Sequence, residues 1–129
     1  MRDAQSSTNK IKKILVVDDE RTITTIFEHS LKHFGYNVHV YNVPENAVKY
    51  FSQHKDLVDC VITDLQMPKM DGITFAHEIK KENPTIPIIM CTGCSDDMLD
   101  GMDMSDINVI LHKPVSFNDL TTTVRSYAA

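Results

Sequence analysis

The sequence predicts a doubly wound α/β domain, with helices on both faces of a five-stranded parallel sheet. Short runs rich in β-branched residues alternate with segments whose apolar residues recur at helical spacing. Such alternation favours parallel strands joined by right-handed helical crossovers, here five strands and five helices. The length of 129 residues suits one domain, and 42% hydrophobic with 24% charged residues is typical of a globular protein.

The first half of the chain supplies two strand–helix units. Residues 13–19 form an apolar run that ends in two acids, and the apolar residues of 23–34 follow at helical spacing until Gly35. Residues 36–42 have the brief, alternating character of a strand. Residues 44–54 begin with proline, which suits the first turn of a helix, and they complete the second unit.

The second half continues this alternation. Residues 59–64 are predicted as the third strand, and 72–83 as a helix that stops before Pro84. The strongly apolar run at 86–93 is predicted to be a strand buried on both faces. Residues 107–114 are predicted as the fifth strand.

Two further helical segments lie near the C-terminus. Segment 95–106 carries five aspartates and three methionines, which predicts a short acidic surface helix interrupted near Gly101; a Met-rich partner surface is the functional alternative. Residues 116–128 form the closing helix, with Ser116 as the predicted N-cap. Its predicted inward side chains are Phe117, Leu120 and Val124.

Domain boundaries and partner classes follow from composition. Residues 1–9 hold almost nothing to bury, so they are predicted to be a flexible arm, and 10–129 one domain. The net charge of -5 argues against nucleic acid or an anionic membrane as the main partner, because basic patches bind both. Three cysteines do not suggest a disulfide framework, and the N-terminus lacks the apolar core of a signal peptide, so a cytoplasmic location is expected.

Reactive side chains gather where the predicted strands end. The first strand ends in Asp18 and Asp19, the third in Asp64, the fourth in Thr92, and the fifth runs into Lys113. The second strand ends in nothing chemically distinctive. Because open α/β sheets bind ligands beyond the carboxyl ends of their strands, we expect these five side chains to share one rim.

These side chains predict phosphoryl-transfer chemistry. Three carboxylates in one cleft repel one another, and a bound cation removes that repulsion. An all-oxygen ligand set suits Mg²⁺, which keeps several waters and favours a phosphate oxygen as a further ligand. A lysine and a hydroxyl on the far side suit the remaining phosphoryl oxygens, where positioning and charge neutralisation supply most of the catalysis.

The sequence resembles the receiver domain of two-component response regulators. The matching motifs are ILVVDDE at 14–20, DLQMPKMDG at 64–72, TG at 92–93 and KP at 113–114. They occur in the order and with the spacing of that family, and the resemblance covers nearly the whole chain from residue 11. It implies the flavodoxin-like strand order 2-1-3-4-5.

The resemblance also implies roles for single residues. Asp64 would be the phosphoacceptor, taking its phosphoryl group from a phosphohistidine on a histidine kinase or a histidine phosphotransfer protein. Asp19, Asp64 and the main-chain carbonyl of Gln66 would ligate Mg²⁺, and Asp18 would act mainly through metal-bound water. Such a chain is a signalling domain rather than an enzyme, although it assists its own phosphorylation and dephosphorylation.

The resemblance also implies which residues bind the phosphoryl oxygens and which surfaces bind partner proteins. Thr92 and Lys113 would each hold a phosphoryl oxygen, and the Lys113–Pro114 peptide bond is expected to be cis. The first helix, around its apolar residues Ile23 and Ile26, would dock the histidine-bearing partner. In this family an output or dimer face often lies in the region that corresponds to residues 95–127.

Three positions depart from the family pattern or bear on its kinetics. Ile110 stands where the family usually carries Tyr or Phe, so the usual aromatic switch is missing. Cys94 and Gln66 flank the expected path of the hydrolytic water. A thiol is a weak hydrogen-bond partner, so we expect a phosphoryl lifetime that is not especially short.

Two other functions stay open at this stage. DDERT at 18–22 approximates the Asp-x-Asp-x-Thr of haloacid-dehalogenase-like phosphatases, with Asp18 as nucleophile, although only Asp119 follows Lys113 where that superfamily needs an acidic pair. A receiver-shaped scaffold that binds a partner without phosphorylation is the other alternative.

Two smaller motifs have simpler interpretations. CTGC at 91–94 has redox-pair spacing, but its first cysteine ends a buried strand, so a redox or zinc role is disfavoured. His29 and His33 have i, i+4 spacing with no third ligand nearby, which favours a solvated pair.

Overall fold

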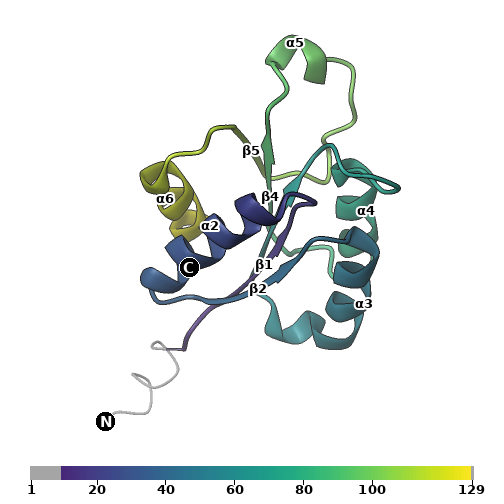
Figure 1. Cartoon of the computed structure of the whole chain (residues 1–129). Coiled ribbons are helices and arrows are strands. Elements are labelled where there is room, and N and C mark those ends of the chain that lie inside the picture. Colours follow the sequence, from purple (N-terminus) through teal and green to yellow (C-terminus); the bar gives the residue numbers. More distant parts are fainter. Residues whose placement is uncertain (1–9, 129) are drawn as a thin grey trace.

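The computed structural model describes residues 10–128 (Figure 1), so the predicted arm at 1–9 lies outside the described residues. Strands and helices alternate along the chain, as predicted. The strands are β1 (Lys13–Val17), β2 (Asn37–Tyr41), β3 (Cys60–Asp64), β4 (Ile88–Thr92) and β5 (Val109–His112). The helices are α2 (Arg21–His33), α3 (Pro44–His54), α4 (Gly72–Glu82), α5 (Asp96–Leu99) and α6 (Phe117–Tyr127), with a 3-10 turn η1 (Lys55–Leu57).

All four strand pairs are parallel, and the sheet order is β2-β1-β3-β4-β5. This confirms the predicted order. The second strand lies on one side of β1 and the third on the other, so the direction of winding reverses at β1. The carboxyl ends of β1 and β3 therefore meet at the switch point, where α/β sheets bind ligands.

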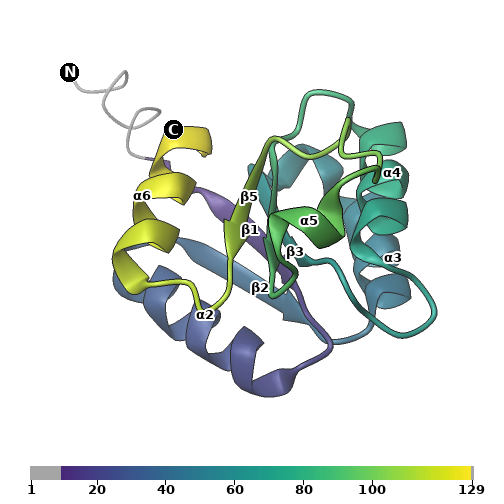
Figure 2. The same cartoon turned by 90° about the horizontal axis from the view of Figure 1, so that it is seen from above.

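Helices cover both faces of the sheet (Figure 2). On one face α2 and α6 bury Phe27, Leu31, Leu120 and Val124 against β1, β3 and β4. On the other face α3 and α4 bury a second apolar cluster, which includes Ala47, Phe51, Phe75 and Ile79. Every residue of β3 and β4 is buried, as expected for inner strands covered on two sides. Within residues 10–128, no helix has the length and apolar character that crossing a bilayer requires.

The fourth crossover is the least regular part of the described chain. Helix α5 has four residues, and Gly101 follows with a left-handed φ of 85°, which confirms the predicted interruption. Leu99 is buried with Leu65, Met90 and Cys94 in a small third cluster, whereas Met98 is 57% and Met102 42% exposed. Segment 95–106 is thus a short acidic helix followed by irregular chain.

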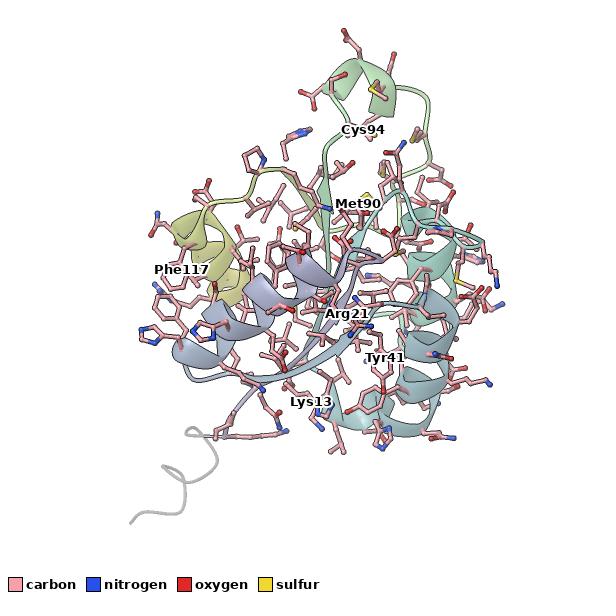
Figure 3. The ribbon with its side chains drawn as sticks, viewed as in Figure 1. Lys13, Arg21, Tyr41, Met90, Cys94 and Phe117 are labelled. Carbon is pink, nitrogen blue, oxygen red and sulfur yellow. The ribbon has the colours of Figure 1, made fainter. Side chains whose placement is uncertain are left out.

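The prediction that Phe117 points inward is wrong, because its side chain is 46% exposed. Phe117 is the first residue of α6, directly after the N-cap Ser116, and its ring lies on the outer side of that helix (Figure 3). It packs edge-on against Phe34 at the end of α2, with 5.0 Å between ring centroids. Leu120 and Val124 face the core as predicted.

The loop between β3 and α4 folds back tightly onto Asp64. Met70 N–H donates to Pro68 O at 2.8 Å around Lys69, whose φ of 71° fits a γ-turn. Gly72 N–H donates to Leu65 O at 2.7 Å. A side chain at Gly72 would place its Cβ 2.1 Å from the carbonyl oxygen of Asp64, so the return of the loop requires glycine.

We therefore expect Gly72→Ala to lower the free energy of unfolding by about 2 kcal/mol or more, since the methyl group meets main-chain atoms that cannot move aside. Urea denaturation measures the change. Gly93→Ala is the matched control, because a Cβ at Gly93 meets no atom within 4 Å. Equal stability of the two variants would contradict the close approach at Gly72.

Candidate functional site

Three predicted carboxylates converge at the carboxyl ends of β1 and β3. Asp18, Asp19 and Asp64 each offer an oxygen, and these oxygens all lie within 4.8 Å of one another. Asp18 is 2% and Asp64 7% exposed, whereas Asp19 faces solvent. Two buried acids and one exposed acid form an open cluster of oxygen ligands at the switch point of the sheet.

Lys113, directly after β5, reaches across the rim into this cluster. Its Nζ lies 2.9 Å from Asp18 Oδ2 and 3.2 Å from Asp64 Oδ1, and Glu20 Oε1 is 4.0 Å away. The Lys113–Pro114 peptide bond is cis, as the resemblance implied. One ammonium group thus contacts two buried carboxylates and lies 4.0 Å from Glu20, and because the cluster also contains Asp19 it keeps an excess of negative charge.

The surroundings shift the pKa values of the paired groups. Burial, and then the charge of Asp18, raise the pKa of Asp64 above its usual value, while Lys113 opposes this rise. Burial by itself would lower the pKa of Lys113, but the hydrogen bond and charge of Asp18, together with Asp64, raise it. An ammonium group that stays protonated therefore faces a carboxylate that is costly to ionise. A divalent cation would reduce that cost.

A cleft of about 360 Å³ opens over the cluster. It is lined by Asp19, Glu20, Asp64, Gln66, Gly93 and Lys113. Acids lie on one side and an ammonium group on the other, which is the arrangement that a hydrated cation together with a phosphoryl group requires. The oxygen donors suit Mg²⁺.

Thr92 ends β4 but lies beneath the surface of the cleft, with 1% of its surface exposed. Its Oγ1 accepts a hydrogen bond from Cys94 N–H at 3.0 Å, and its carbonyl oxygen accepts from Lys113 N–H at 2.7 Å. Gly93, the next residue, is the one that lines the cleft. The side chain of Thr92 is therefore covered in this structure, and Gly93 forms that part of the cleft surface.

Asn42 is a site residue that the sequence analysis missed. It follows β2, the strand that we expected to contribute nothing, and its Nδ2 donates to Asp18 O at 2.8 Å and to Thr24 Oγ1 at 3.0 Å. These bonds fix the main chain at Asp18 against the first turn of α2. An amide side chain directly after a strand, on the rim that carries the acids, was the signal available in the sequence.

The cysteine thiols and the exposed histidine pair supply no reactive group to the site. All three cysteines are free and buried. Burial raises the pKa of Cys91 to about 12, so the thiolate that redox or metal chemistry needs is strongly disfavoured. His29 and His33 are both exposed on α2, in agreement with a solvated pair.

Comparison with known proteins identifies close similarity over most of the chain. The family model "Response regulator receiver domain" matches residues 14–125. A probable transcriptional regulator ycf27 of Guillardia theta is 36% identical over 117 residues, which cover 89% of this chain and 44% of that protein. The alkaline phosphatase synthesis transcriptional regulatory protein PhoP of Bacillus subtilis is 31% identical over 89% of this chain and 48% of its own length. The chain spans about half the length of these curated relatives.

Solved structures agree with the fold. A response regulator receiver domain protein from Clostridium thermocellum superposes with a TM-score of 0.85 at 32% identity, covering 92% of this chain and 94% of that one. The response regulator protein TrrA from Thermotoga maritima, solved in complex with Mg²⁺ and BeF, has a TM-score of 0.80 at 30% identity, covering 91% and 99% of the two chains.

The raised pKa of Asp64 predicts a pH-dependent effect of Asp64→Asn on stability. The folded protein binds a proton at Asp64 more tightly than the unfolded chain, so this group contributes less stability as the pH rises through the window above 3.8. At pH 7 without divalent metal, the variant should melt a few degrees higher than wild type. The difference should shrink as the pH is lowered through that window.

Calorimetric melting curves test this expectation, with Asp71→Asn as the control. Asp71 caps α4 by accepting from Thr74 N–H at 2.8 Å, and asparagine caps a helix equally well. A lower melting temperature for Asp64→Asn than for wild type at pH 7 would show that the pairing with Lys113 outweighs the burial of charge.

Proposed function

Because the chain belongs to the response regulator receiver family, we propose that it accepts a phosphoryl group on Asp64 in a Mg²⁺-dependent reaction. The observation that carries the proposal is the convergence of Asp18, Asp19 and Asp64 within 4.8 Å, with Lys113 bonded to two of them. The charged side chains that the sequence predicts for the site thus all lie at the same edge of the sheet.

The chemistry follows from the positions of these side chains. A carboxylate oxygen of Asp64 forms the new bond to phosphorus, the phosphorus–nitrogen bond of a phosphohistidine breaks, and the departing imidazole keeps the bonding electron pair and takes up a proton. Lys113 pairs with one phosphoryl oxygen, and the hydroxyl of Thr92 donates a hydrogen bond to another. Mg²⁺, held by Asp19, Asp64 and the carbonyl of Gln66, with Asp18 acting through its waters, would neutralise the negative charge between acceptor and phosphoryl group.

A surface beside the site supports a histidine kinase or a histidine phosphotransfer protein as the donor. An apolar groove of about 360 Å³ borders Lys113. It is lined by Ile23, Ile26, Phe27, Pro114 and Val115 together with that lysine. Ile26 is 53% exposed, so an apolar partner helix can bury it while its phosphohistidine reaches the cleft.

The output and the location are further proposals. Several relatives are named transcriptional regulators, and they extend well beyond the length matched here. The exposed Met98 and Met102 of segment 95–106, together with α6, suit an output or dimer surface within residues 95–127. We place the phosphotransfer in the cytoplasm, where the three free thiols would stay reduced.

The two alternatives have less support. A haloacid-dehalogenase-like phosphatase would need Asp18 as a free nucleophile. This carboxylate accepts from Glu20 N–H at 2.9 Å and does not line the cleft, whereas Asp64 does. The family model matches the receiver over residues 14–125. A scaffold without phosphorylation leaves the clustered acids unexplained, because burying like charges destabilises a fold.

Incubation with acetyl phosphate and Mg²⁺ should label the wild-type protein stoichiometrically with a hydroxylamine-sensitive phosphoryl group. Asp64→Asn should reduce the label to background, because an amide is a far weaker nucleophile. Chelating the metal should reduce the rate by about tenfold or more. Intact mass spectrometry measures the label.

Asp71→Asn serves as the matched control, because it changes an exposed acid of the same loop that caps a helix and should label like wild type. A label that persists in Asp64→Asn and maps to Asp18 would favour the phosphatase, and a wild-type chain that never labels would favour the scaffold.

Ile26→Asp should slow phosphotransfer from a phosphorylated histidine domain by about tenfold or more, because it places a charge in the apolar contact. Labelling by acetyl phosphate, which needs no docking surface, should stay at the wild-type rate. Leu57→Asp is the matched control, since Leu57 is 51% exposed on η1, outside the groove. Equal transfer rates for the two variants would remove the groove as the docking surface.

A further inference from the structure

His112, the last residue of β5, contacts Cys94 and Asp96, which follow closely after Thr92. It is the direct neighbour of Thr92 in the register of the parallel pair. Its Nδ1 lies 3.0 Å from Cys94 O, and its Nε2 lies 3.0 Å from Asp96 Oδ1 in the first residue of α5. Residues 93–95 are called the Thr92 loop below. The ring of His112 thus bridges this loop and the start of α5.

Both partners of the ring are hydrogen-bond acceptors, a carbonyl oxygen and a carboxylate. A neutral ring donates to one of these acceptors, and a protonated ring donates to both. Among the described residues, Asp96 has the carboxylate that lies within ion-pairing distance of His112 Nε2. The ammonium of the adjacent Lys113 is bonded to Asp18 and Asp64 instead.

The bond to Cys94 leads directly to the hydroxyl of Thr92. Cys94 accepts from His112 through its carbonyl oxygen, and its N–H donates to Thr92 Oγ1 at 3.0 Å. Its side chain is 3% exposed and anchors the loop below α5 (Figure 3). Since Cys94 N–H occupies a lone pair of the Thr92 oxygen, the hydroxyl proton is free to point elsewhere.

We propose that His112 is a positioning residue for Thr92. By tying Cys94 O to the end of β5, it holds the Thr92 loop in an arrangement in which Cys94 N–H bonds the hydroxyl oxygen and leaves its proton able to point toward a phosphoryl oxygen. The inference rests on the proposed function, because it needs Thr92 to contact that phosphoryl group. His112 itself does not line the cleft.

Two substitutions at this position separate the contacts. Leucine removes both donors from a side chain that is 46% exposed, so the fold tolerates it. Asparagine keeps an N–H donor near the place of Nδ1 and loses the reach to Asp96. We expect His112→Leu to slow the labelling of Asp64 by acetyl phosphate about fivefold, the effect of one lost hydrogen bond, and His112→Asn to recover most of the rate.

His77→Leu is the matched control. His77 also pairs with an aspartate of the same crossover, its Nδ1 lying 3.3 Å from Asp106 Oδ2, but it lies on α4 away from the Thr92 loop. This variant should label at the wild-type rate. Mg²⁺ affinity should be unchanged in all variants, because the acidic ligands are intact, and that result separates a positioning effect from general damage to the fold.

Amide hydrogen exchange gives a direct readout of the loop. Exchange at Cys94 N–H should accelerate in His112→Leu and stay slow in His112→Asn. Wild-type labelling rates in His112→Leu, or unchanged protection at Cys94, would overturn the inference, and so would an asparagine variant as slow as the leucine one. A wild-type protein that cannot be labelled refutes the proposed function instead, so the two failures are distinguishable.

Discussion

The contact on which the site depends is the pairing of one ammonium group, Lys113 Nζ, with two buried carboxylates, Asp18 and Asp64. Parallel strands with one switch point bring their carboxyl ends together, so acids placed there must lie close to one another. Burial and repulsion raise the pKa of Asp64, and Lys113 offsets part of that cost. The apolar burial of the sheet, whose strands β3 and β4 are buried at every residue, offsets the remaining free-energy cost. A well-packed core thus tolerates an unfavourable cluster of charge at its rim.

Most of the fold could be predicted because its signals are local. Apolar patterns marked the five strands and the five α-helices, and Ser116 caps α6 as the sequence indicated. The prediction that Phe117 points inward was wrong because spacing alone does not tell where the first turn of a helix meets the core. The ring of Phe117 packs instead against Phe34, which is distant in the sequence. The strand order came from the family resemblance, since pairing between distant strands leaves little trace in a single sequence.

The charged part of the site could be predicted for the same reason, since each acid directly follows an apolar run. Its polar supports could not, because they depend on tertiary contacts. Asn42 acts through the main chain of Asp18, and Thr92 lies beneath Gly93 rather than at the surface of the cleft. Ile110, in place of the usual aromatic residue, packs against the small cluster of Leu65, Met90 and Leu99. It therefore links the end of the sheet to α5 by aliphatic contact.

The brevity of α5 has a consequence for the way this end of the molecule changes shape. Four helical residues and two buried side chains, Cys94 and Leu99, hold the crossover, and the chain from Gly101 to Asp106 is largely exposed. A unit with so few buried contacts opens at a small fraction of the free energy that unfolds the sheet. Local unfolding of this crossover therefore costs little free energy. A binding partner can select among its conformations while β4 and β5 remain paired.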